Sequence, residues 1–165
     1  MTVTHVRTVT TTRTVTTRAV PPASPCLAVD LAGTFAVVPG SAGAGQIEYV
    51  LTLKNTSHRR CSLSGLPRAT LLGATGAPLP TRVTPAVQVT RAPVVLEPGA
   101  SAVAHARFSP DVAGPGDSQT GACQPVAHTL QVTPNGGGAT DAPIEPPTSV
   151  CERGTLQFDA YGYAG

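Results

Sequence analysis

The sequence predicts an all-β protein, and three observations support this fold class. Glycine and proline each occur 17 times in 165 residues, so most runs of helix-forming residues are interrupted before three turns can form. The runs that remain are short, and several alternate apolar and polar side chains with a period of two. Four cysteines, each beside such a run, indicate a disulfide framework: Cys26, Cys61, Cys123 and Cys151.

Residues 1–25 have the composition of a low-complexity, Thr/Pro-rich stalk or linker. Arg7, Arg13 and Arg18 each begin a similar Thr- and Val-rich repeat, and the segment ends in several prolines. Such a segment buries too little apolar surface to offset roughly 1–2 kcal/mol of backbone entropy per residue, which predicts a disordered tail. An ordered edge strand is the alternative, because Thr and Val both favour β structure. We expect the folded domain to occupy residues 26–165.

Residues 46–54 and 101–108 are the two clearest strands of this domain. In both, apolar side chains occur at every second position, which is the pattern of a strand with one buried face. The same alternation places His105 on the outer face of the second strand. The predicted inward positions are Ile47, Tyr49, Leu51 and Leu53, and Ala102, Ala104, Ala106 and Phe108.

The other predicted strands are shorter and are separated by glycine- and proline-rich turns. The first covers residues 27–38, with Leu27, Val29 and Leu31 on one face, and a turn over 40–45 follows it. Seven or eight such strands predict an immunoglobulin-like antiparallel two-sheet β-sandwich. The remaining predicted strands are 69–72, 87–90, 94–96, 129–133 and 155–160.

The cysteines allow three pairings, and the order of the strands favours one of them. If residues 46–54 return antiparallel beside the first strand, Cys61 comes within reach of Cys26. The same argument pairs Cys123 with Cys151. Two disulfides and no C-x-x-C motif predict an oxidising compartment, so we expect an extracytoplasmic protein, secreted or anchored at the cell surface. Since Met1 is not followed by a signal sequence, we expect the exporting segment to lie upstream.

Composition argues against a nucleic-acid partner. The net charge is +2, and the first 25 residues contribute three arginines and no acid, so the rest of the chain is close to neutral. Aromatic residues make up 4% of the chain, and tryptophan is absent. Nucleic-acid binding needs clustered positive charge and aromatic rings for base stacking, and neither is present.

The sequence contains no pattern that predicts catalysis or a bound cofactor. No G-x-S-x-G motif occurs, and the Ser, His and Asp residues are scattered. His5, His58, His105 and His128 do not have the spacing of metal ligands, so we predict no metal site. Tyr49, Tyr161 and Tyr163 are the only tyrosines available to stack on a sugar ring, and the first of them falls on an inward position.

Two stretches carry a resemblance to a known family. They are Cys61–Pro67, with the pattern C-x-L-x-G-x-P, and Leu96–Ala102, with the pattern L-x-P-G-x-S-A. Together with the four cysteines, they resemble an actinobacterial secreted and lipoprotein family, domain of unknown function 4232, over roughly residues 25–160. The resemblance implies an immunoglobulin-like sandwich outside the cytoplasm, often behind a low-complexity linker, and implies no activity.

These observations predict a non-enzymatic, extracytoplasmic binding or structural module of the bacterial cell envelope. Its partner would be a protein or a cell-wall polymer, and contact with the membrane would come only through an upstream anchor. The alternative function is extracytoplasmic handling of copper or zinc by His58, His105 or His128. Titration with a metal separates the two hypotheses.

Overall fold

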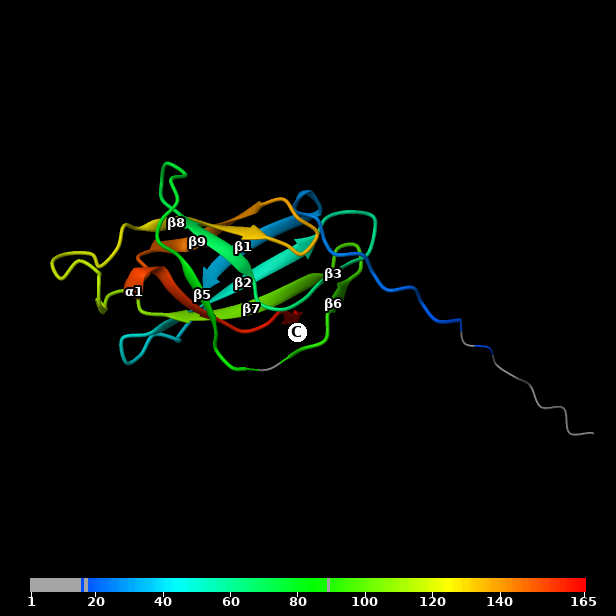
Figure 1. Ribbon diagram of the computed structural model, residues 1–165, viewed down its shortest axis with the longest axis horizontal. Helices are drawn as coiled ribbons and strands as arrows, with labels where there is room; N and C mark the ends of the chain where they lie inside the picture. The colour runs from blue at the N-terminus through cyan, green and yellow to red at the C-terminus, as the bar shows by residue number, and fades with distance from the viewer. Residues whose placement is uncertain (1–15, 17, 89) are drawn as a thin grey trace, which may run out of the picture.

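The computed structural model describes residue 16, residues 18–88 and residues 90–165, and these form an all-β fold (Figure 1). Eleven strands are joined by loops and by two short helical turns, η1 (Ala28–Asp30) and α1 (Cys151–Gly154). No helix in the described part of the chain is long and apolar enough to cross a membrane. The strands are β1 (Leu31–Val37), β2 (Ile47–Asn55), β3 (Cys61–Leu63), β4 (Arg68–Leu72), β5 (Arg82–Pro85), β6 (Val94–Leu96), β7 (Ser101–Phe108), β8 (Ala127–Thr133), β9 (Thr140–Thr148), β10 (Thr155–Phe158) and β11 (Gly162–Tyr163).

Nine of the strands form one hydrogen-bonded sheet in the order β4-β8-β9-β1-β2-β7-β10-β5, with β11 paired to β7. β3 and β6 form a separate pair. The two ends of the path are also linked, because Leu79 N–H donates to Leu71 O and Leu71 N–H donates to Thr81 Oγ1, each at 2.8 Å. The sheet therefore nearly closes on itself.

The prediction of a wholly antiparallel two-sheet sandwich needs correction. β1 pairs with β9 and β10 pairs with β5 in parallel. Parallel pairing arises because these partners are far apart in the sequence and are joined by long connections rather than by hairpins. The all-β class is confirmed. In place of two antiparallel sheets, nine strands form one sheet with both parallel and antiparallel pairs.

The predicted faces of the two clearest strands are confirmed and build the core. Tyr49, Leu51 and Leu53 of β2 are buried, and so are Ala102, Ala104, Ala106 and Phe108 of β7. The Phe35 ring lies with its centroid 5.2 Å from that of Tyr49 and 6.0 Å from that of Phe158. Burial of each such ring stabilises the fold by roughly 1.5–3 kcal/mol.

Two other predicted strands need correction, the first only in part, because residues 31–37 of the predicted strand 27–38 form β1. Ala28–Asp30 form the turn η1 instead, since Ala28 N–H donates to Gly137 O at 3.0 Å and Asp30 N–H donates to Leu27 O. This turn buries Ala28 and leaves Val29 85% exposed, although the predicted strand placed Val29 on the same face as Leu31, which is buried. Residues 87, 88 and 90 lie outside any strand, because the parallel partner of β10 is the segment Arg82–Pro85.

The two disulfides, Cys26–Cys61 and Cys123–Cys151, have the expected pairing. They lie toward opposite ends of the molecule, the first beside β3 and the second at α1 (Figure 1). Disulfides persist in oxidising compartments, so both bridges are consistent with a location outside the cytoplasm.

The predicted stalk lies mostly outside the described residues, which begin at residue 16 and exclude residue 17. Close to the domain, Ser62 N–H donates to Ser24 O at 2.8 Å, and the Arg60 guanidinium donates to Pro21 O at 2.6 Å. Pro25 also pairs with Ser62 in an isolated parallel β-bridge. Residues 21–25 therefore contact the domain, and the boundary between stalk and domain at Cys26 stays a prediction.

Candidate functional site

A row of polar side chains crosses the outer face of four neighbouring strands. The pairing of the strands places Glu48 of β2 beside Arg107 of β7, Arg107 beside Gln157 of β10, and Gln157 beside Thr84 of β5. Because side chains alternate along a strand, this row points away from the buried residues that flank it. We call the surface around this row the polar face, and it comprises Glu48, Arg82, Thr84, His105, Arg107, Thr155, Gln157 and Asp159.

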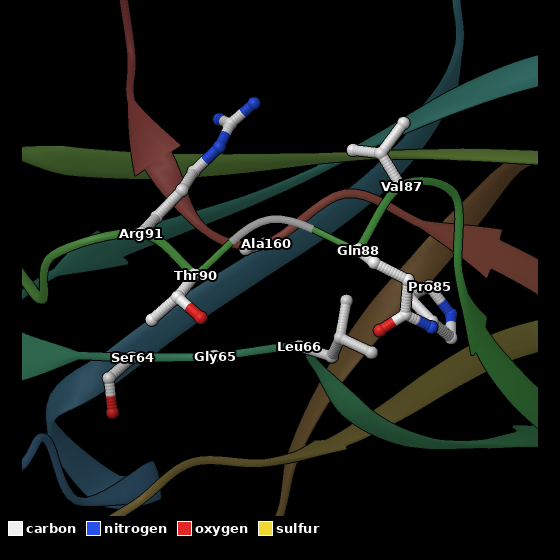
Figure 2. Close-up of a pocket in the computed structure, with 9 residues that line it drawn as sticks. All are labelled: Ser64, Gly65, Leu66, Pro85, Val87, Gln88, Thr90, Arg91 and Ala160. Atoms are coloured by element: carbon white, nitrogen blue, oxygen red, sulfur yellow. The ribbon is translucent and has the colours of Figure 1, made fainter.

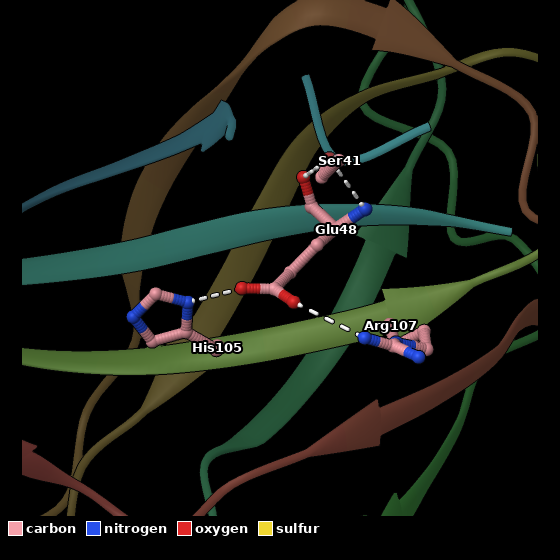
Figure 3. Close-up of polar contacts among 4 residues, drawn as sticks. All are labelled: Ser41, Glu48, His105 and Arg107. Atoms are coloured by element: carbon pink, nitrogen blue, oxygen red, sulfur yellow. Dashed lines mark hydrogen bonds and ion pairs between the residues drawn. The ribbon is translucent and has the colours of Figure 1, made fainter. Parts of the chain in front are cut away.

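Glu48 is the centre of a small charged cluster at one side of this face (Figure 3). One carboxylate oxygen lies 2.6 Å from His105 Nδ1, and the other lies 3.6 Å from an Arg107 nitrogen. Ser41 fixes the backbone of Glu48, because its hydroxyl accepts from Glu48 N–H at 3.1 Å. The His105 and Arg107 side chains are 44% and 61% exposed, so the pairs add little stability. Their main effect is to orient polar groups toward solvent.

Three hollows meet on this face at Gln157, which lines all of them. The hollow beside Glu48 has a volume of about 240 Å³, and the one beside Phe108 has about 220 Å³. The third is larger, at about 760 Å³, and we call it the arginine hollow. Its lining consists of Arg82, Thr84, Pro115, Gly116, Glu152, Arg153, Thr155 and Gln157.

The wall of the arginine hollow includes an unusual backbone conformation at α1. Glu152 and Arg153 have φ values of 53° and 57°, and Gly154 follows with 75°. This left-handed region costs roughly 1–2 kcal/mol for each residue that carries a Cβ. Gly154 is required here for a second reason, since a Cβ at this position would overlap Pro80 O.

The carboxylate of Asp117 holds this left-handed turn in place. It accepts hydrogen bonds from the backbone N–H of Arg153 at 2.8 Å and of Gly114 at 2.9 Å, and also from Glu152 N–H. The Gln124 amide donates a further bond at 2.6 Å. Burial by itself would raise the pKa of Asp117, but these donors lower it from 3.8 to about 2. Asp117 therefore acts as a fixed anion on which the turn is built.

A different hollow, of about 450 Å³, lies where the β3–β4 connection meets the loop that follows β5 (Figure 2). Leu66, Val87 and Ala160 form its apolar part, and Gln88 and Thr90 contribute polar groups. Figure 2 shows the Arg91 guanidinium pointing away from the Ser64–Gly65–Leu66 segment. Among the described residues that line this hollow, Arg91 is the one charged residue, whereas Arg82, Glu152 and Arg153 line the arginine hollow.

The histidines singled out in the sequence lie on separate elements. His58 is exposed in the β2–β3 loop, His128 is exposed on β8, and only His105 belongs to the polar face. His5 lies outside the described residues. Within the described part of the chain, Asp117, Cys123 and Cys151 are the one group of three close ligand-type side chains, and both cysteines are in a disulfide.

The tyrosines also differ in position. Tyr49 is buried, its hydroxyl donates to Pro146 O at 2.9 Å, and burial raises its pKa. Tyr161 is 3% exposed, and burial raises the pKa of its hydroxyl as well, so neither ring is available for stacking on a ligand. Tyr163 is exposed, and its hydroxyl accepts from Val95 N–H.

Sequence reasoning did not identify Asp117, Glu152, Arg153 or Arg82. The available signal was the position of Glu152 and Arg153 directly after Cys151, together with the turn-forming residues Gly114–Asp117. Both segments are joined to each other by hydrogen bonds that no local pattern encodes.

Comparison with known proteins gives one match. The model of a family described as Domain of unknown function (DUF4232) matches residues 26–161. No curated protein and no solved structure matches the chain.

Proposed function

Because this chain belongs to the DUF4232 family, whose description assigns no activity, we propose from its geometry that it is a non-enzymatic, extracytoplasmic binding module of the cell envelope. The polar face is its binding surface. The observation that carries this proposal is the four-strand row from Glu48 to Thr84, with the hollows that meet at Gln157. A polymer or a protein of the envelope is the partner.

The location outside the cytoplasm is supported by the two disulfides, and the resemblance to an actinobacterial secreted and lipoprotein family agrees with it. The direction of the N-terminal segment supports a role in display. Residues 18–25 leave the domain beside β3, whereas α1, which contributes Glu152 and Arg153 to the arginine hollow, lies at the other end of the molecule (Figure 1). A domain attached through its N-terminus would thus present the hollow away from its attachment.

The chemistry of the polar face supports binding rather than catalysis. His105 Nδ1 contacts a carboxylate, and among the hydrogen bonds of the described residues none joins the His105 ring to a Ser, Thr or Cys side chain. Nucleophilic catalysis needs such a contact between nucleophile and base. Metal handling by His58, His105 or His128 gains no support from the structure, because the one cluster of three ligand-type side chains in the described part of the chain contains no histidine.

The proposal is tested by binding to purified envelope polymers and proteins, measured by surface plasmon resonance. A variant with Glu48→Ala, His105→Ala and Arg107→Ala should lose binding by about tenfold or more, since charge-assisted contacts contribute roughly 1.5–3 kcal/mol each. The matched control is Lys54→Ala with Ser101→Ala, a pair on the same two strands at their opposite ends. Equal binding by both variants would contradict the proposed surface.

A further inference from the structure

We propose that the arginine hollow binds a carboxylate or phosphate group of an acidic glycan through the guanidinium groups of Arg82 and Arg153. This inference rests on the proposed function and names the ligand chemistry of the same polar face. It is carried by three features of the hollow: guanidinium groups without a carboxylate partner, an enforced backbone at Arg153, and a lining whose described residues include no aromatic or large aliphatic side chain.

The first feature is the supply of positive charge. Arg82 and Arg153 line the hollow from β5 and from α1, and neither has a carboxylate partner within 4.0 Å in the described part of the chain. Arg107 differs, because it already lies 3.6 Å from Glu48. Planar guanidinium groups bind carboxylate and phosphate oxygens with two parallel hydrogen bonds. One carboxylate, that of Glu152, lines the same hollow, so positive charge is in excess.

The second feature is the way the side chain of Arg153 is positioned. Its left-handed backbone is held by the hydrogen bond from Arg153 N–H to the Asp117 carboxylate and by the disulfide at Cys151. The Arg153 guanidinium lies against Gly116, where a Cβ would overlap it. The Glu152 side chain lies against Gly114 in the same way, with 2.8 Å between its Cγ and a Cβ built there. Backbone strain that is maintained by so many contacts is typical of binding and catalytic sites.

The third feature is the remaining lining, which selects the class of ligand. Thr84, Thr155 and Gln157 offer hydroxyl and amide groups suited to sugar hydroxyls. No aromatic and no large aliphatic side chain is among the lining residues, whereas protein partners are usually anchored by such groups. A neutral sugar would also lack a ring to stack on. An acidic, hydroxyl-rich polymer therefore fits the hollow best.

The experiment is isothermal titration calorimetry of the folded protein with two probes, oligogalacturonate for carboxylate and poly(glycerol phosphate) for phosphate. We expect one or both to bind, and binding to weaken as salt is raised. Arg153→Gln and Arg82→Gln should each weaken binding by about tenfold or more, because each removes a charge-assisted contact. Arg59→Gln is the control, an exposed arginine in the β2–β3 loop that carries the same change of charge; its affinity should stay within about twofold.

The outcomes separate this inference from the proposed function. If one probe binds, it identifies the recognised group as a carboxylate or as a phosphate. If both bind, the hollow recognises the negative charge that the two groups share. Unchanged affinity in Arg153→Gln and Arg82→Gln overturns the inference, while loss of binding in the Glu48, His105 and Arg107 variant would still uphold the polar face. A glutamate-rich peptide is titrated in the same way, and its binding when neither polymer binds overturns the glycan class. If no probe binds, the inference is wrong. The proposed function is then decided by the binding measurements with purified envelope polymers and proteins alone.

Discussion

The two ends of the molecule use the same covalent device in different surroundings. At one end, Cys26–Cys61 joins regular structure, because Cys61 begins β3 and the chain before Cys26 pairs with Ser62. At the other end, Cys123–Cys151 joins the loop that follows β7 to the left-handed turn α1. The first bridge secures strands that already pair, and the second secures a segment that has no strand pairing of its own.

This difference allows the stabilisation by each disulfide to be divided into two parts, the restriction of the unfolded chain and the contacts of the native structure around the bridge. The bridges span 35 and 28 residues, so chain entropy assigns each nearly the same stabilisation, about 3–4 kcal/mol. Any larger difference between them must come from the native structure around each bridge. The comparison therefore predicts that the Cys26–Cys61 end supports the fold as a whole, and that the Cys123–Cys151 end supports the arginine hollow.

The largest expected effect comes from removing each bridge in turn. Cys26→Ala with Cys61→Ala should lower the free energy of unfolding by about 4 kcal/mol, and Cys123→Ala with Cys151→Ala by about 2 kcal/mol. The second loss is smaller because residues 109–126 can loosen while the β2–β7 pairing persists. Urea denaturation measures both losses, and amide exchange locates them. Equal losses with uniform exchange would show that the two ends are equivalent.

The next effect concerns acid. The pKa of Asp117 is about 2 in the folded protein and 3.8 ordinarily, so folding favours its charged form. Its contribution is complete above about pH 4 and is lost as the pH falls toward 2. Asp117→Asn should remove this part of the pH dependence and loosen α1, because an amide nitrogen replaces one accepting oxygen. Unfolding measured between pH 6 and 2 tests this, and parallel curves for both proteins would contradict it.

A smaller effect, of opposite sign, is expected at Arg153. Arg153→Gly should raise the free energy of unfolding by about 0.5–1 kcal/mol, because glycine adopts positive φ without a steric cost but has a more flexible unfolded state. Arg153→Ala is the control, since it removes the charge and keeps the Cβ, and it should give no gain. Thermal denaturation measures both. Both variants should lose binding to the acidic probes, so a gain in stability would accompany a loss of function.

The smallest effect is expected at the N-terminus. Deleting residues 1–20 should change the free energy of unfolding by less than about 0.5 kcal/mol, since a low-complexity segment gains little from burial. Deletion through Ser24 should cost more, because Ser62 N–H then loses its acceptor. Urea denaturation measures both changes, and amide exchange on residues 1–24 tests whether the segment is ordered. Strong protection there would favour an integral strand over a stalk.

The sequence was informative where one strand face is buried and the other is solvated. β2 and β7 satisfy this condition, so their alternation predicted the inward side chains and the outward position of His105. β9 was not predicted, because prolines are rare inside strands and Pro143, Pro146 and Pro147 conceal this one. The arginine hollow was not predicted, because its residues come from segments that are distant in the sequence. Asp117 and Arg153 are 36 positions apart, and their contact depends on the complete fold.

The near closure of the sheet also bears on self-association. Exposed strand edges carry unpaired N–H and C=O groups, and these recruit strands from neighbouring molecules. At the outer edge of β4 both backbone groups of Leu71 are already occupied, and Pro78 pairs with Leu72. Proline has no N–H to donate, which makes this edge a poor template for further pairing. Copies of the domain crowded together should therefore resist aggregation through this edge.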